Sequence, residues 1–156
     1  MADKISPQRR SFNMSRIRSR NTRPEVTVRK WLHSQGLRFR VHCQTLPARP
    51  DIVLPRFRAV VLVHGCFWHA HEDCCCFKIP ASRTEWWLRK LGRNKARDWQ
   101  QQRELELAGW RVFVVWECEL KSARRAETLE KLRDGITQPD NDVPLCDLQA
   151  DYSGYN

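Results

Sequence analysis

Soft metal ligands are concentrated in one irregular, loop-like segment of the sequence. Cys66, His71 and Cys74 follow one another there with four and two residues between them, and Cys118 follows the last apolar run. Thiolates and imidazoles at such short spacings are typical of a closed tetrahedral zinc site. The spacing leaves open which of the three consecutive cysteines beginning at Cys74 would bind. A set of small, buried cysteines without metal is the alternative.

A second site, for a hard metal ion, is indicated by Asp51 and His64. Asp51 begins one apolar run and His64 ends the next, so a hairpin would bring the acid and the imidazole to one edge of a sheet. A carboxylate there suits Mg²⁺, whose remaining ligands a phosphate substrate would supply. Glu25, near a helix start, is placed to orient water on that ion. The alternatives are a Pro50–Asp51 turn and a Glu25 that only caps its helix.

Aromatic residues stand beside both of these groups. Phe67 and Trp68 fall in the loop, while Trp86 and Trp87 begin a long helical pattern flanked by Lys and Arg. Aromatic side chains at a loop tip near a basic surface can wedge between DNA base pairs. Because successive helix residues point about 100° apart, only one of Trp86 and Trp87 can face DNA. The other would pack against the protein, and the alternative for the group as a whole is that two of the four aromatic residues belong to the core.

Hydrophobic periodicity and capping signals predict the elements that position these residues. Asn21 or Thr22 caps a first helix that ends at Gly36, and a long helix covers residues 83–107. A charged helix is predicted over residues 121–133. Apolar runs predict strands at residues 37–43, 51–54, 59–63 and 111–116. This order predicts a mixed α/β sheet with helices packed on it.

The composition favours a single domain that binds a polyanion. The chain has 156 residues, and 28 Lys and Arg against 18 Asp and Glu give it a net charge of +10. Such an excess attracts nucleic acid, and the 41% of hydrophobic residues excludes a disordered basic tail. Seven cysteines, an odd number, and a polar start disfavour a secreted disulfide framework. No apolar run is long enough to span a membrane, so we expect a protein of the reducing cytoplasm.

The chain divides into three predicted parts. Residues 1–20 carry five arginines and almost no acid, which predicts a basic arm, helical from Ser11, that orders on a polyanion. A solvated tail is the alternative for this segment. Residues 21–135 form the main domain, and residues 136–156 form a C-terminal tail.

Long stretches of the sequence resemble the very short patch repair endonucleases, which nick DNA at T:G mismatches. The resemblance extends from about Ser11 to Leu120 and is carried by SFNMSRIRSRNTRPE, LPARPDIVLPRFRAVVLVHGC, HGCFWHAHEDC, TEWWLRKLGRNKARD and GWRVFVVWECEL. It implies a fold like that of the type II restriction endonucleases, with a mixed central sheet flanked by helices and a structural zinc site. Residues 21–135 would then be the nuclease domain.

The resemblance also implies roles for individual catalytic residues. Asp51 would hold the catalytic Mg²⁺, Val63 would add its backbone carbonyl, and His69 would be the base that activates the attacking water. His64 and Glu25 would bind water on the metal or the scissile phosphate. The restriction-endonuclease superfamily usually follows its first acid with an acid-x-Lys, which this family replaces by a single acid and a His. A carbonyl ligand needs no particular side chain, so Val63 fits its role.

The same matching assigns the zinc ligands and the DNA contacts. The zinc ligands are Cys66, His71, Cys74 and Cys118, which selects Cys74 among the consecutive cysteines and leaves Cys43, Cys75, Cys76 and Cys146 without a role. The implied intercalating wedge consists of Phe67, Trp68 and Trp87. Lys90 and Asn94, one helical turn apart, would read the mismatched bases. Met14 and Ile17 of the arm would enter the minor groove.

The implied activity is Mg²⁺-dependent nicking of duplex DNA 5′ of the thymine in a T:G mismatch left by deamination of 5-methylcytosine. A wobble pair unstacks at lower cost than a matched pair, which suits a wedge. The protein would be a bacterial DNA repair hydrolase of the nucleoid that acts as a monomer. Two other classes stay open: a non-catalytic zinc-containing DNA-binding domain, which would not need Asp51, His64 and His69, and a nuclease that cuts ordinary duplex at one site.

Overall fold

The computed structural model describes residues 5–138. Of the predicted tail at residues 136–156, Ile136 and Thr137 end the last helix, and residues 139–156, with Cys146, lie outside the described residues. The elements in chain order are α1 (Pro7–Ser15), α2 (Arg23–Ser34), β1 (Ile52–Leu54), the 3₁₀ turn η1 (Pro55–Phe57), β2 (Ala59–His64), α3 (Thr84–Leu107), β3 (Arg111–Trp116), the 3₁₀ turn η2 (Glu117–Leu120) and α4 (Arg125–Thr137).

The described strands form one mixed sheet of three strands in the order β1-β2-β3. β1 pairs antiparallel with β2, with Ile52 opposite Val61. β3 pairs parallel with β2, with Trp116 opposite His64. The start of β1 therefore lies at the same edge of the sheet as the ends of β2 and β3. The predicted mixed α/β class and the predicted hairpin are confirmed.

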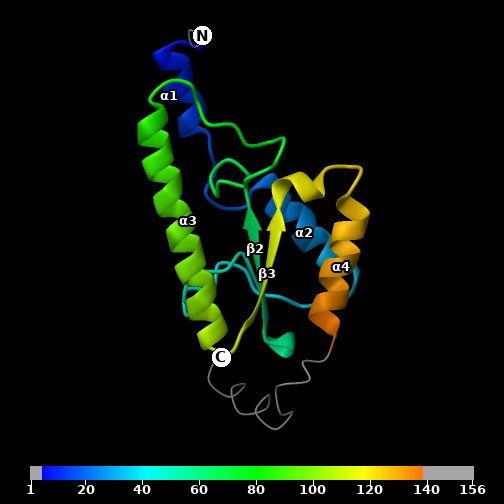
Figure 1. Ribbon diagram of the computed structural model, residues 1–156. Coiled ribbons are helices and arrows are strands. Elements are labelled where there is room, and N and C mark those ends of the chain that lie inside the picture. The colour runs from blue at the N-terminus through cyan, green and yellow to red at the C-terminus, as the bar shows by residue number, and fades with distance from the viewer. Residues whose placement is uncertain (1–4, 139–156) are drawn as a thin grey trace.

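Helices cover both faces of this sheet, with α3 on one side and α2 and α4 on the other (Figure 1). All six residues of β2 are buried. Its alternate residues serve two separate clusters, because successive strand side chains point to opposite faces. Val61 packs with α2 and α4, while Val60 packs with Leu105 of α3. β2 is thus the central, fully buried strand that its apolar sequence predicts.

The predicted strand at residues 37–43 is wrong. It is reduced to a single bridge, in which Arg40 and Val53 exchange backbone hydrogen bonds of 2.8 and 2.9 Å. His42 has a φ of 54°, and this left-handed backbone conformation ends any extended run. Leu37 and Phe39 still bury their side chains against the core. The first two apolar residues of the alternation are therefore covered without sheet pairing, while the third, Val41, is 38% exposed.

The helix boundaries also differ in part from the predicted ones. α2 begins after Thr22, whose hydroxyl accepts from the backbone N–H of Glu25, as predicted. α1 begins four residues before Ser11, because Ser6 caps it and Pro7 suits its first position. α4 begins four residues later than predicted, since η2 and a turn occupy residues 117–124.

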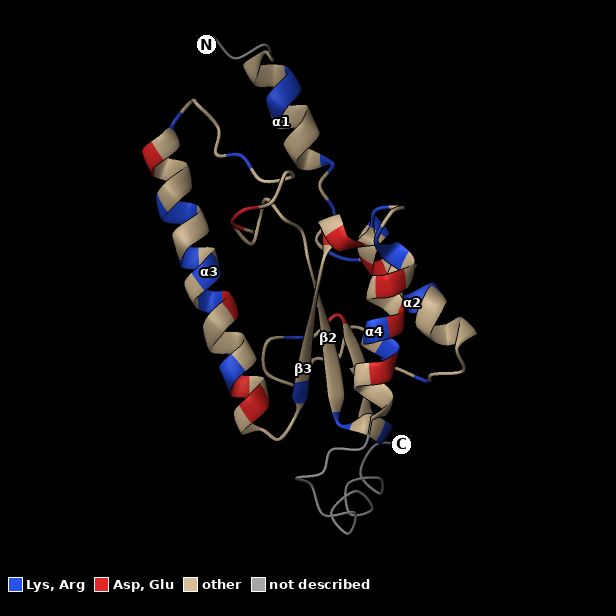
Figure 2. Cartoon of the chain, turned by 45° about the vertical axis from the view of Figure 1, so that its right-hand side comes forward, with Lys and Arg blue, Asp and Glu red and all other residues tan. Residues whose placement is uncertain are grey.

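Basic residues lie along α1 and α3 (Figure 2). In α1 they are Arg9 and Arg10, and that helix contains no Asp or Glu. Between residues 5 and 138, no helix is long and apolar enough to cross a membrane. In Figure 1 α1 lies beyond the upper end of the sheet and α3 runs along one side of it, so their basic residues add positive charge near the end where β1 starts and β2 ends.

Substitution by alanine at two helical glycines should change the free energy of unfolding in opposite directions. An alanine Cβ at Gly92 would meet nothing within 4 Å, whereas one at Gly135 would lie 2.8 Å from Cε1 of Phe113. We expect Gly92→Ala to stabilise the protein by about 0.5–1 kcal/mol through helix propensity. Gly135→Ala should instead destabilise it, because overpacking costs about 1–3 kcal/mol. Urea denaturation of both variants measures this; equal changes in the free energy of unfolding would contradict the packing of α4 on β3.

Candidate functional site

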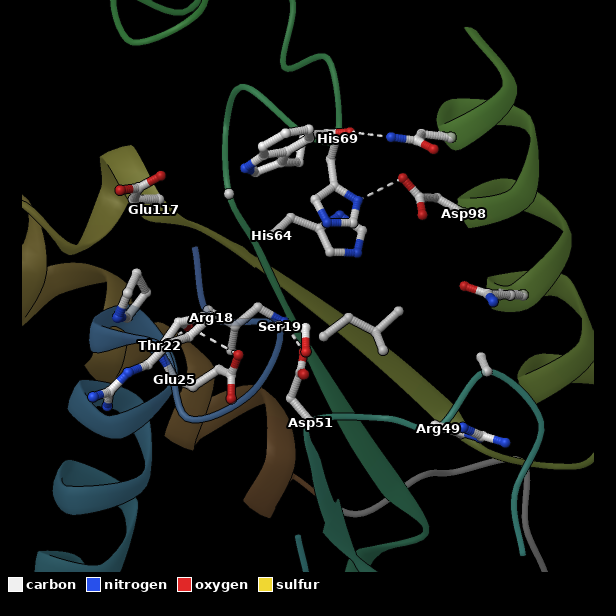
Figure 3. Close-up of a pocket in the computed structure, with 18 of the residues that line it drawn as sticks. Arg18, Ser19, Thr22, Glu25, Arg49, Asp51, His64, His69, Asp98 and Glu117 are labelled. Carbon is white, nitrogen blue, oxygen red and sulfur yellow. Dashed lines mark hydrogen bonds and ion pairs between the residues drawn. The ribbon is translucent and has the colours of Figure 1, made fainter. Parts of the chain in front are cut away.

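The edge where β1 starts and β2 ends holds the predicted acid and imidazole together. The carboxylate of Asp51 accepts a 2.7 Å hydrogen bond from the backbone N–H of Val63. Asp51, Val63 and His64 line one pocket together with Glu25 and His69 (Figure 3). The structure thus brings together all five residues that the resemblance assigns to catalysis.

The loop after β2 folds back on the strand and stacks His69 on His64. The N–H of His69 donates to the carbonyl of Gly65 at 3.1 Å, and the N–H of His71 donates to that of Cys66 at 3.0 Å. These tight turns bring the two imidazoles into a parallel stack, with ring centroids 3.9 Å apart and planes 3° apart (Figure 3). His69 is therefore held above the end of β2.

Asp98 is a site residue that the sequence analysis missed. Its carboxylate lies 2.6 Å from Nδ1 of His69, and its residue is only 8% exposed (Figure 3). A signal was present, because Asp98 lies midway between Leu91 and Leu105 at spacings of seven, and all three are buried on α3. An acid on a buried helix face requires a polar partner. The sequence does not show that this partner is His69, because the two residues are 29 positions apart.

Burial shifts the pKa values of the two groups at the end of β2 in opposite directions. Desolvation raises the pKa of Asp51 to about 6, although the Val63 N–H opposes the shift. Desolvation and the neighbouring His69 lower the pKa of His64 to about 4. In both cases burial disfavours the charged form. A cation beside Asp51 would restore its ionised form.

The oxygen atoms available at this edge are suitable ligands for a hard divalent cation. The Val63 N–H is the only hydrogen-bond donor to the Asp51 carboxylate within residues 5–138, so oxygen lone pairs remain free toward the pocket. Carboxylate and carbonyl oxygens are the ligands that Mg²⁺ accepts. The residues present therefore match the predicted ion in chemistry.

Glu25 has a structural task in addition to any catalytic one. It is buried, and its carboxylate accepts from the Thr22 hydroxyl at 2.9 Å, the Asn21 N–H at 2.9 Å and Arg29 at 3.0 Å. Thr22 and Glu25 thereby close the start of α2 in the manner of a capping box. The helix cap expected as the alternative role of Glu25 is present, and the same side chain lines the pocket.

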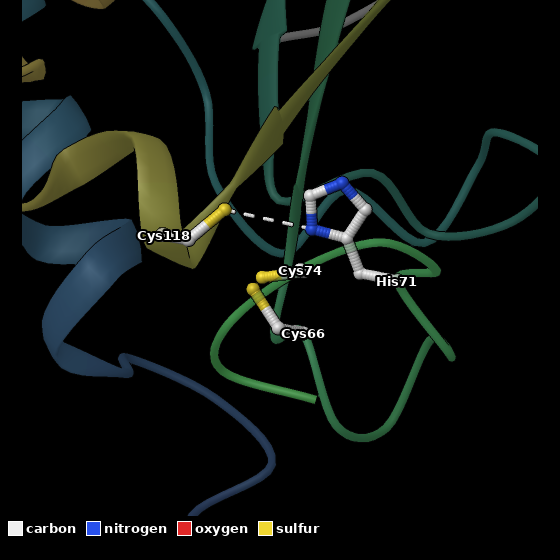
Figure 4. A group of neighbouring side chains, drawn as sticks. All are labelled: Cys66, His71, Cys74 and Cys118. Atoms are coloured by element: carbon white, nitrogen blue, oxygen red, sulfur yellow. Dashed lines mark hydrogen bonds between the residues drawn. The ribbon is translucent and has the colours of Figure 1, made fainter. Parts of the chain in front are cut away.

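A separate group of soft ligands lies beside the pocket. The ligand atoms of Cys66, His71, Cys74 and Cys118 all lie within 4.8 Å of one another, and Nδ1 of His71 is 3.5 Å from Sγ of Cys118 (Figure 4). Zn–N and Zn–S bonds of about 2.1 and 2.3 Å place the one nitrogen and three sulfur ligands of a tetrahedral site about 3.6–3.8 Å apart. The four residues predicted as zinc ligands thus converge in a geometry that such an ion fits.

The neighbouring cysteines have different surroundings. Cys75 is exposed, and Sγ of Cys76 accepts from Nζ of Lys121 at 2.8 Å. The sulfurs of these two residues and of Cys74 also lie within 4.8 Å of one another, yet that group contains no imidazole. Only Cys74 belongs to both groups.

The predicted wedge residues form one aromatic cluster. The ring centroid of Phe67 lies 5.0 Å from that of Trp68 and 5.2 Å from that of Trp87. Trp86 packs its ring edge-on against Trp87 at 4.8 Å and is 45% exposed. The two adjacent tryptophans do point in different directions, but the exposed one is Trp86, while Trp87, which the resemblance assigns to the wedge, is half-buried in the cluster.

The two predicted base readers both contact this cluster. Nζ of Lys90 lies within 5.5 Å of the ring centroids of Trp68 and Trp87. The amide nitrogen of Asn94 donates to the backbone carbonyl of Trp68 at 3.0 Å. Cation–π attraction and this hydrogen bond therefore tie the wedge loop to α3.

The two arm residues predicted for the minor groove have accessible side chains. Met14 is 41% exposed and Ile17 is 48% exposed. Ile17 also lines the pocket that contains Asp51. The C-terminal end of the arm thus lies at the rim of the pocket that contains Asp51.

Together the fold and the site define an α/β protein with a carboxylate and histidine centre next to a Cys₃His group that could hold a metal ion. The chain also matches known proteins. Residues 2–75 match the family model described as DNA mismatch endonuclease Vsr. The type II nicking enzyme V.XorIIP of Xanthomonas oryzae pv. oryzae is 52% identical over 120 residues, which cover 77% of this chain and 88% of that protein.

Two further relatives support the same assignment. The DNA mismatch endonuclease Vsr of Escherichia coli is 46% identical over 125 residues, covering 80% of each chain. The type II nicking enzyme V.NmeAIP of Neisseria meningitidis serogroup A is 47% identical over 122 residues, covering 78% of this chain and 86% of that protein. The chain belongs to the Vsr family, the family of the very short patch repair endonucleases.

The geometry of the soft-ligand group predicts that Cys74 and Cys75 differ in metal binding. We expect Cys74→Ser to lose a bound Zn²⁺, because it removes one of four thiolate and imidazole ligands. Cys75→Ser is the matched control and should keep about one zinc per chain, since Cys75 is exposed and outside the group of four. Atomic emission on the purified proteins measures the ratio; equal zinc content would contradict the choice of Cys74.

Proposed function

We propose that this protein is a DNA repair endonuclease that nicks duplex DNA 5′ of the thymine in a T:G mismatch left by deamination of 5-methylcytosine. Mg²⁺ would be the catalytic ion and Zn²⁺ a structural one. Membership in the Vsr family supports the mismatch endonuclease activity. The pocket supports hydrolysis, because an acid suited to a cation lies with an imidazole held by a second acid.

The observation that carries this proposal is the 2.6 Å contact between His69 and Asp98 in the pocket of Asp51. A carboxylate only accepts, so Nδ1 of His69 must donate to it. The neutral imidazole then keeps its lone pair on Nε2, where it can accept a proton. A DNA-binding domain without catalysis would have no use for this arrangement.

Each pocket residue then has a chemical task in phosphodiester hydrolysis. His69 takes a proton from the attacking water through Nε2, and the Asp98 carboxylate stabilises the imidazolium that forms. Asp51 and the backbone carbonyl of Val63 would hold Mg²⁺. When bound, Mg²⁺ would neutralise the negative charge that develops on the phosphate and the leaving oxygen. His64 and Glu25 would orient water and phosphate at the rim of this centre.

The aromatic cluster and the basic arm would supply DNA recognition. Phe67, Trp68 and Trp87 would enter the weakened stack at a T:G pair. Lys90 and Asn94 already contact the wedge loop, so insertion would bring them to the displaced bases. Met14 and Ile17 would enter the minor groove from the arm.

The remaining parts of the proposal concern architecture and setting. The sheet with helices on both faces supports a restriction-endonuclease-like nuclease domain at residues 21–135, preceded by the basic arm. Zn²⁺ on the Cys₃His group would fix the loop after β2 to the end of β3. The protein would act as a monomer on DNA, in the bacterial cytoplasm with the nucleoid.

Substitution of Asp98 tests the role of its contact with His69. We expect Asp98→Asn to lower the single-turnover nicking rate by about 100-fold or more, because an amide stabilises an imidazolium poorly and can reverse the tautomer. DNA affinity should change little, since Asp98 is buried. Asp134→Asn, on the exposed surface of α4, serves as the matched control. A nicking rate for Asp98→Asn equal to that of this control would show that the reaction does not depend on the contact between Asp98 and His69.

Matched duplexes test the reaction itself. We expect the protein with Mg²⁺ to nick a T:G duplex and to leave the C:G duplex of the same sequence intact, and chelation of Mg²⁺ to stop nicking. Asp51→Asn should abolish nicking while DNA binding persists. Gel assays with a panel of flanking sequences that carry methylated cytosine measure both properties.

The outcomes separate the competing classes. Equal cutting of T:G and C:G duplexes would indicate a site-specific nuclease. Binding without cutting by the wild-type protein on every duplex, with Mg²⁺ present, would indicate a non-catalytic zinc-containing DNA-binding domain. Full activity of Asp51→Asn would show that the cation is held elsewhere.

A further inference from the structure

Trp116 lies at the junction between the catalytic histidines and the Cys₃His group, and neither group includes it. It ends β3, directly opposite His64 in the parallel register, and its side chain is half-buried. Two residues later in the chain comes Cys118, one member of the metal-binding group. Trp116 thus stands between two centres whose connection the proposed function leaves unexplained.

The indole contacts a histidine from each centre. The ring of His71 stacks on that of Trp116, with centroids 3.9 Å apart and planes 9° apart. The ring of His64 meets the same indole at 5.2 Å in an edge-to-face geometry, with planes 77° apart. Both arrangements are preferred ones for aromatic pairs. Since His64 also stacks on His69, an unbroken series of ring contacts joins the metal-binding group to the base.

Ring packing is the main constraint on the orientation of His64. No hydrogen bond to its imidazole exists within residues 5–138, in contrast to His69, which Asp98 holds. A ring without a hydrogen bond can rotate about its side-chain torsions unless its neighbours fill the space. Trp116 and His69 are the aromatic neighbours that confine it.

We propose that Trp116 is a positioning residue that fixes the ring of His64, and through it the base His69, to the Cys66, His71, Cys74 and Cys118 group. This inference rests on the proposed function for its catalytic consequence. It predicts that the metal-binding group supports the reaction through the indole as well as through the backbone of the loop. Loss of the ring should misplace the catalytic imidazoles while DNA binding and metal content persist.

Three variants isolate the ring contacts. Trp116→Leu retains apolar volume without a π face, Trp116→Phe retains a smaller ring, and Trp99→Leu removes an indole that is 71% exposed on α3. The chain has five histidines, so their ring protons can be followed individually by NMR. We measure these ring signals, zinc content, affinity for a T:G duplex and the single-turnover nicking rate with Mg²⁺.

We expect Trp116→Leu to shift the ring protons of His64 and His71 while those of His33 and His42 stay in place. Its nicking rate should fall by about 10- to 100-fold, since a misplaced catalytic group has an effect of that size. Zinc content and DNA affinity should match those of Trp99→Leu. Trp116→Phe should lie between wild type and Trp116→Leu in both the ring shifts and the rate.

A zinc-loaded Trp116→Leu that nicks at the wild-type rate would overturn the positioning role, as would unchanged ring signals of His64. If Trp116→Leu does not fold, Trp116→Phe decides by the same criteria. A wild-type protein that nicks no duplex would refute the proposed function instead. The NOEs between the rings of His64 and His69, compared in wild type and Trp116→Leu, would then still report whether Trp116 fixes that side chain.

Discussion

The site depends on one constraint: β2 pairs antiparallel with β1 on one side and parallel with β3 on the other. Its antiparallel pairing with β1 brings Asp51 to the end of β2, where the Val63 N–H holds the carboxylate. Its parallel pairing with β3 places Trp116 beside His64. Because β2 is buried on both faces, a slip by one residue would exchange its side chains between the two core clusters and would move Asp51 away from the Val63 N–H.

A loop without regular secondary structure carries most of the remaining site, and it is fixed by contacts of three kinds. Backbone hydrogen bonds close the turns from Gly65 to His71. The side chains of Lys90 and Asn94 hold the aromatic tip against α3. His71 of the loop contacts Cys118 after β3 at 3.5 Å within the Cys₃His group. Loops that bind ligands usually have fewer such contacts and move more freely. A metal ion at the Cys₃His group would further limit the motion of this loop, where both DNA binding and catalysis require order.

Much of this could be predicted from local sequence, and the failures have identifiable physical causes. Thr22 and Glu25 signal a helix start because capping depends on residues only three apart. The bounds of β2 and α3 follow from unbroken apolar and helical periodicity. Residues 37–43 alternate like a strand, yet the left-handed backbone at His42 stops pairing after one bridge. The burial of Leu37 and Phe39 produces the same pattern without a ladder.

The sequence by itself determined the chemistry available: soft ligands at short spacings, an acid and an imidazole at the ends of adjoining apolar runs, and a family resemblance that names roles for them. Only the tertiary structure decided which groups act together. It set Asp98 against His69, 29 positions away in the chain, and it placed Trp116 between His64 and His71. These contacts join residues on different elements, and their distances depend on how helix and sheet pack, a property that local periodicity and spacing do not encode.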